Sequence, residues 1–181
     1  MKKLILSLGF IILFTAIHAQ TNRGDWMIGG NLRINTTESN NEFTFQPMAG
    51  YFFAKGFAAG AEFKLSFSKF GAEKSTALGA GPFARYYFNL NNSSFKPLIH
   101  SSFMMETVTT KQNGVKNSNT VSSLFIGGGA AYFINENVAL EAIAGYNRSK
   151  YENVDSEGGF AFRLGFQVHL LGRELRTIKG Y

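Results

Sequence analysis

Apolar and polar side chains alternate along most of the chain, and helical periodicity is hard to find. Between residues 57 and 67, for example, Phe63 and Phe67 fall on one face while Glu62 and Lys64 fall on the other. A repeat of two is typical of β-strands, whose successive side chains point to opposite faces. The pattern predicts eight strands, at residues 26–34, 43–53, 57–67, 77–90, 99–106, 123–132, 138–147 and 160–170.

The connections between these segments alternate in length. Three are short, at residues 55–56, 89–94 and 135–137. Four are longer and polar, at residues 35–42, 68–76, 107–120 and 148–158. Outer-membrane barrels have an even number of strands, short periplasmic turns and longer extracellular loops, so both termini are expected on the periplasmic side.

Volume decides which face points inward. The apolar face carries about five large side chains per strand, and the interior of an eight-stranded barrel is only just wide enough to be filled by side chains. The opposite face combines many glycines with charged residues, as a narrow polar lumen requires. The sequence therefore predicts an all-β fold, an eight-stranded antiparallel transmembrane up-and-down β-barrel. The alternative is a soluble barrel, such as a lipocalin, with the apolar face inside.

Aromatic residues gather toward the short-turn ends of the predicted strands, which suggests a girdle at the level of the lipid headgroups. They are Trp26, Tyr51, Phe53, Phe57, Tyr86, Phe88 and Tyr132.

The N-terminus has the pattern of a signal peptide over residues 1–19. Lys2 and Lys3 precede an apolar stretch, and Ala19 is a small residue before a cut at Gln20. The alternative is a membrane anchor, but the apolar run is short for a span. We expect residues 20–181 to form one outer-membrane barrel domain, with strands to about residue 170 and a short periplasmic tail.

Composition excludes several classes of protein. The chain has no cysteine, which excludes disulfides, thiolate metal sites and a lipid-modified cysteine. Mean hydropathy is −0.05, and beyond the N-terminus no apolar run is long enough for a membrane helix. The net charge is +6, of which two charges belong to the leader, and the rest are spread without the clustered basic face of a nucleic-acid-binding protein.

Segment 81–88, Gly-Pro-Phe-Ala-Arg-Tyr-Tyr-Phe, resembles a hallmark of the small outer-membrane β-barrel family related to OmpA- and OmpX-type barrels. Segment 131–142 resembles the turn between the sixth and seventh strands of that family, and segments 50–53 and 164–166 fit as well. The resemblance covers essentially the whole mature chain. It implies an eight-stranded barrel without catalytic residues. The chain departs from the family after the last strand. Many members end on an aromatic residue as that strand closes, whereas here a tail runs on from Leu171 to Tyr181.

Charged residues on the predicted inward face are the main candidate site. Buried charges must be paired and hydrogen-bonded, so they predict a lumenal network that stiffens the barrel, or alternatively lines a narrow ion path. Strand adjacency suggests that Glu62 and Lys64 neighbour Arg85, and that Glu141 neighbours Arg163. The predicted network comprises Arg33, Glu62, Lys64, Arg85, Glu141 and Arg163.

Motifs for catalysis or cofactors are weak. Gly79, Gly81 and Ala84 match the spacing of a dinucleotide fingerprint, but Pro82 lies inside it and no helix follows. The remaining histidines, His100 and His169, fall on separate strands and are not expected to form a triad or a metal site.

The sequence thus favours a multi-pass protein of the Gram-negative cell outer membrane, with no enzymatic activity, catalytic residue, cofactor or metal. It would be structural or would mediate surface contacts through extracellular loops; the alternative is a narrow, porin-like channel for small solutes or ions. Expected partners are outer-membrane lipid, the barrel-assembly machinery during insertion and an unidentified surface ligand, but no nucleic acid.

Overall fold

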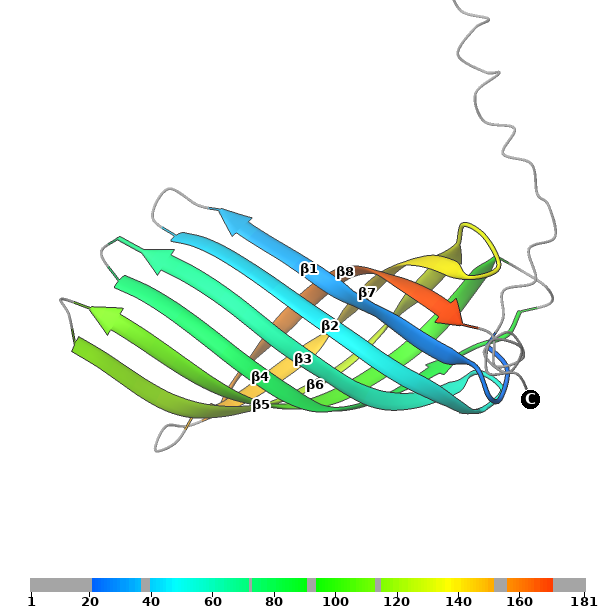
Figure 1. Cartoon of the computed structure of the whole chain (residues 1–181), viewed down its shortest axis with the longest axis horizontal. Helices are drawn as coiled ribbons and strands as arrows, with labels where there is room; N and C mark the ends of the chain where they lie inside the picture. Colours follow the sequence, from blue (N-terminus) through cyan, green and yellow to red (C-terminus); the bar gives the residue numbers. More distant parts are fainter. Residues whose placement is uncertain are drawn as a thin grey trace, which may run out of the picture.

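The computed structural model describes residues 21–36, 40–71, 73–90, 94–112, 115–151 and 156–170. The predicted signal peptide and the tail from residue 171 lie outside the described residues. Within them, eight strands form a closed barrel in which each strand pairs antiparallel with its neighbours in the chain and β8 pairs with β1 (Figure 1). The strands are β1 (Trp26–Thr36), β2 (Asn40–Ala54), β3 (Phe57–Phe70), β4 (Glu73–Tyr87), β5 (Phe95–Gln112), β6 (Val115–Phe133), β7 (Val138–Tyr151) and β8 (Glu157–Leu170).

The predicted strand number, order and barrel closure are confirmed. Closure pairs every strand edge, which is the condition for strands to cross hydrocarbon. The described residues contain no helix of the length and apolarity needed to cross a membrane.

The predicted outward face is also confirmed. Phe63 and Leu78 are 53% and 55% exposed, whereas Glu62, next to Phe63, is 1% exposed. We call the end of the barrel where β1 begins and β8 ends the near end, and the opposite end the far end. Aromatic rings of the predicted girdle contact one another at the near end, where the rings of Trp26 and Tyr51 lie 5.3 Å apart.

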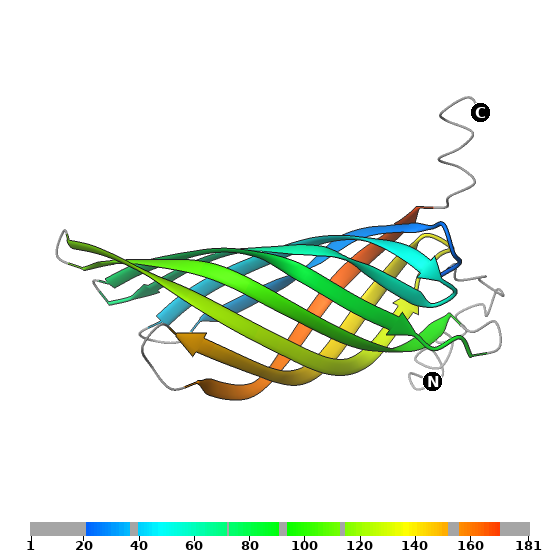
Figure 2. The same ribbon diagram turned by 90° about the horizontal axis from the view of Figure 1, so that it is seen from below.

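The prediction of long polar loops is wrong. Residues 107–112 belong to β5 and residues 115–120 to β6, and these strands pair without a break from Glu106 opposite Val121 to Gln112 opposite Val115. Figure 2 shows this hairpin projecting beyond the neighbouring strands at the far end. Threonine is a good strand former, and we attribute the polar composition here to the position of these residues beyond the apolar band. Polarity therefore marks where the apolar wall ends rather than where the strands end.

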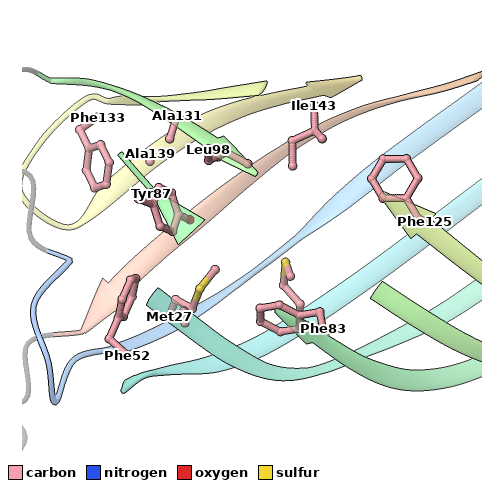
Figure 3. Close-up of a cluster of buried hydrophobic side chains, with 12 residues drawn as sticks. Met27, Phe52, Phe83, Tyr87, Leu98, Phe125, Ala131, Phe133, Ala139 and Ile143 are labelled. Carbon is pink, nitrogen blue, oxygen red and sulfur yellow. The ribbon is translucent and has the colours of Figure 1, made fainter. Parts of the chain in front are cut away.

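The lumen is also more apolar than the sequence analysis predicts from its inward-facing glycines and charged residues. A buried apolar cluster fills the near half and the middle of the lumen (Figure 3). It consists of Met27, Met48, Phe52, Ala58, Phe83, Tyr87, Leu98, Phe125, Ala131, Phe133, Ala139 and Ile143. Several of these residues lie inside aromatic runs, such as Tyr51-Phe52-Phe53, where alternation sends the middle ring inward.

Glycine makes room for these rings. A Cβ atom on Gly50 would lie 2.7 Å from the ring of Phe83, which is closer than real Cβ contacts. At the near end, Gly56 has a φ of 78° in the tight turn between β2 and β3, a conformation that glycine adopts without strain. The small residues thus allow a narrow barrel to enclose large side chains.

Candidate functional site

A buried ion pair spans the lumen in the near half of the barrel. The guanidinium of Arg85 on β4 donates a 2.6 Å hydrogen bond to the carboxylate of Glu141 on β7, and both side chains are 0% exposed. Tyr87 donates to the same carboxylate at 2.7 Å and accepts from Arg85 at 3.0 Å. Arg85 also donates to Nδ1 of His100 at 3.2 Å. We call Arg85, Tyr87 and Glu141 the lumenal seal, because together they bridge strands on opposite sides of the barrel.

A second charged group lies around Glu62 on β3. Its carboxylate is 3.6 Å from Nε2 of His100 and 3.8 Å from Nη1 of Arg163 on β8. The guanidinium of Arg163 lies 3.7 Å from the centre of the Phe125 ring, close enough for a cation–π interaction. The side chain of Arg163 is thus positioned by both a carboxylate and an aromatic face.

A third group lies toward the far end. Lys64 donates a 2.6 Å hydrogen bond to Glu106, and Ser123 donates to the other oxygen of that carboxylate at 3.1 Å. The lysine side chain is 24% exposed, so this pair is more hydrated than the lumenal seal. Both oxygens of the Glu106 carboxylate therefore accept a hydrogen bond, and the ammonium group of Lys64 has a carboxylate partner.

The structure therefore places the described members of the predicted network in the lumen but in different pairs from those suggested by strand adjacency. Arg85 pairs with Glu141, Glu62 lies beside Arg163, and Lys64 pairs with Glu106. In a narrow barrel, long side chains reach across the lumen to strands that are distant around the wall. For Arg33, the backbone pairs with Thr44, and the side chain lies outside the described part of the structure.

Sequence reasoning missed Tyr87 as part of the site. Its signal was the pair Tyr86-Tyr87, because two consecutive aromatic residues in a strand must face opposite sides. Tyr86 is exposed on the outer wall, and Tyr87 is fully buried. The hydroxyl of an inward tyrosine needs a hydrogen-bond partner, and Glu141 supplies it.

Between the lumenal seal and the far end lies a polar cavity of about 560 Å³, which we call the cup. Its floor includes Glu62, Phe125 and Arg163, and its lining continues to Ser75 and Glu157 near the far strand ends. Hydroxyl groups cover much of the wall, including Thr44, Ser66, Ser68, Ser102, Ser123 and Ser149. The volume lies within the range of small-molecule sites, and the lining suits polar solutes.

The near side of the lumenal seal is filled by side chains. The ring of His169 lies 5.0 Å from that of Phe133 and 5.6 Å from that of Phe52, measured between centroids. At the near end, Lys96 donates to Asn89 at 2.6 Å and to Thr21 at 3.2 Å. The cup is therefore separated from the near end by the seal, an aromatic layer and this polar contact.

The two histidines lie in separate surroundings. His100 packs between Phe83 and Phe125, and His169 packs among the near-end rings. In the part of the chain that the structure describes, no three His, Cys, Asp or Glu residues are arranged to hold a metal ion.

Comparisons with solved structures identify the fold. Neisserial surface protein A matches with a TM-score of 0.58 and 19% identity over 80% of this chain and 96% of that one. The N-terminal β-barrel domain of Pseudomonas aeruginosa OprF matches with a TM-score of 0.53 and 16% identity, covering 82% and 98%. Ail, the attachment invasion locus protein of Yersinia pestis, matches with a TM-score of 0.50 and 16% identity, covering 82% and 99%. At these identities the likeness establishes the fold alone.

Sequence comparison identifies the family. No curated protein matches the chain significantly. The family described as outer membrane protein beta-barrel domain matches over residues 5–169 of this chain. Membership of the chain in this family supports the predicted outer-membrane location. The chain belongs to this family of outer-membrane β-barrel proteins.

Proposed function

We propose that the protein is a non-enzymatic, non-conducting barrel that acts by contact at its far end, on the cell surface. The observation that carries the proposal is the lumenal seal. Arg85 and Glu141 are joined at 2.6 Å with no exposed side-chain surface, and the near half of the lumen is filled by side chains. A solute in the cup would have to break this pair to pass.

The projecting strands support a role in surface contact. β5 and β6 have 18 and 19 residues, whereas a tilted strand needs about 9–11 to cross a bilayer. The surplus lies at the far end, which is extracellular if the barrel has the usual orientation, with its short turns in the periplasm. One structural neighbour, Ail, is named for attachment and invasion.

Planar-bilayer recording of the full chain tests the absence of conduction. We expect no current steps from the wild type, and steps from the variant Arg85→Ser/Glu141→Ser/Phe52→Ala/Phe133→Ala, because it removes both halves of the seal and two rings of the aromatic layer behind it. The matched control is Arg148→Ser, which removes an exposed far-end cation and leaves the lumen intact. Current steps from the wild type would contradict the proposal.

The second candidate function is a narrow channel, and the cup is the observation that favours it, since the cavity reaches the middle of the barrel. A conducting wild type whose current changes in Arg163→Ala, at the floor of the cup, would establish that function instead.

The contact role is tested by shortening the projecting hairpin. Residues 109–118 are replaced by Asn-Gly, which joins the facing pair Val108 and Asn119 by a two-residue turn. Cells expressing this variant should be retained less on an epithelial monolayer than cells expressing the wild type, at equal surface amounts of folded barrel. Lys55→Gln, in the near-end turn, should leave retention unchanged. Equal retention with and without the hairpin would refute a contact role for this segment.

A further inference from the structure

The far end of the barrel separates its charges by face. Six cations lie on the outward positions of their strands and are exposed: Lys69, Lys74, Lys111, Lys116, Arg148 and Lys150. The carboxylates of the far half, within the described strands, lie on inward positions instead: Glu42, Glu62, Glu73, Glu106 and Glu157. The outer wall here therefore presents positive charge that no described carboxylate on the same face offsets.

Four of these lysines form a single row. Lys69 on β3 is opposite Lys74 on β4, Lys74 is opposite Lys111 on β5, and Lys111 is opposite Lys116 on β6. Neighbouring strands are about 4.7–4.9 Å apart, and like charges directly opposite each other destabilise a sheet. None of the four forms an ion pair with a carboxylate of the described residues. The mutual repulsion of these ammonium groups favours the binding of an external anion.

The positions next to the lysine row match the layers of a lipid. One outward position closer to the near end, Thr76, Thr109 and Ser118 lie in register on β4, β5 and β6, and Thr109 and Ser118 share a 3.0 Å hydrogen bond. One position further on β4, Leu78 begins the apolar band, whereas on β3 the band already begins at Phe67, opposite Thr76. On β4, β5 and β6, apolar, hydroxyl and ammonium groups thus follow one another along the outer wall, in the order of acyl chains, sugar and phosphate in a phosphorylated glycolipid.

We propose that the lysine row binds the phosphate groups of phosphorylated glycolipid headgroups in the outer leaflet. Ammonium groups are effective point-charge ligands for phosphate, and basic residues at a membrane surface attract anionic lipids. Lys111 and Lys116 lie in the hairpin to which we assign surface contact. Lipid binding by the outer wall is nevertheless measured without cells, so its test does not depend on cell retention or on whether the lumen conducts.

The test compares lipid retention by the folded full chain in detergent, measured by native mass spectrometry. The probes are lipid A, which carries phosphates on a glucosamine disaccharide, and the same lipid after enzymatic removal of the phosphates. We expect the wild type to retain lipid A preferentially. Lys74→Gln/Lys111→Gln, which removes the two central lysines, should weaken lipid A binding roughly 30-fold. The matched control, Arg23→Gln/Lys55→Gln, removes two exposed cations at the near end and should keep the wild-type preference.

Two further measurements separate the proposal from a general charge effect. Lys74→Arg/Lys111→Arg keeps the charges and should retain lipid A. Rising salt should weaken lipid A binding by the wild type, because exposed charges are screened, and this arm does not depend on the folding of any variant. Equal retention of the two lipids by the wild type, equal losses in the near-end and far-end variants, or binding insensitive to salt would each overturn the proposal.

Discussion

Removing one half of the lumenal seal should cost far more than removing both halves. Arg85→Ala leaves the Glu141 carboxylate buried with Tyr87 as its remaining hydrogen-bond donor. Breaking a buried pair in this way typically lowers the free energy of unfolding by about 3–5 kcal/mol. Replacing both partners with apolar side chains of similar size, as in Arg85→Met/Glu141→Leu, is often neutral because no uncompensated charge remains. Tyr87 then loses its acceptor, so a residual cost of about 1–3 kcal/mol is expected.

The assay is urea unfolding of the refolded barrel in lipid vesicles. Fluorescence of Trp26, the single tryptophan, follows the near end, and the gel mobility of unheated samples measures the folded fraction. Arg148→Ala is the control and should change the free energy by less than about 1 kcal/mol, because the side chain is exposed and its hydrogen bond to Ser156 lies in solvent. A loss below about 1 kcal/mol for Arg85→Ala would refute the seal as a buried pair. A loss in Arg85→Met/Glu141→Leu equal to the sum of the losses in Arg85→Met and Glu141→Leu alone would show that the two charges are not coupled.

Three further predictions concern the lipid face, the interior and the cup. Phe63→Arg places a charge on the outward face and should lower the free energy of unfolding in vesicles by about 2–4 kcal/mol if that face meets the bilayer core. Thr109→Arg, beyond the apolar band, should lower it little. Equal effects of the two variants in the same unfolding assay would argue against lipid at Phe63. Gly50→Ala should lower the free energy of unfolding by about 1–3 kcal/mol through overpacking against Phe83, and Phe83→Leu should restore part of it in a double-mutant cycle; additive losses would refute this contact. Phe125→Ala should lower the free energy of unfolding by about 3–5 kcal/mol. It also removes the ring that covers the guanidinium of Arg163, so modification of Arg163 by a dicarbonyl reagent should become faster. An unchanged rate of modification would contradict the stacking.

The outer wall of the barrel could be predicted from the sequence because strand geometry is local. A period of two assigns Phe63 and Glu62 to opposite faces whatever the rest of the chain does. The limit on interior volume then assigns the apolar face to lipid. The same rule places Tyr87 on the inward face, because its neighbour Tyr86 faces outward.

The ends of the strands depended on pairing. Residues 107–120 look like a loop because they are polar, yet the backbone groups of residues 107–112 and 115–120 continue the ladder between β5 and β6. The polarity of a segment indicates whether its side chains face lipid or water, whereas the end of a strand is set by where backbone pairing with the neighbouring strand ends. The lysine row follows from the same pairing, since Lys69, Lys74, Lys111 and Lys116 are far apart in sequence and become neighbours only through register.

The pairs inside the lumen were decided by the closed tertiary structure. The sequence by itself determined that Arg85, Glu141, Glu62 and Arg163 face inward, together with the family and the number of strands. It did not determine which charges meet, because strand adjacency relates only neighbours around the wall. Closing eight strands into a narrow tube brings β4 within side-chain reach of β7, and the 2.6 Å contact between Arg85 and Glu141 exists only through that closure.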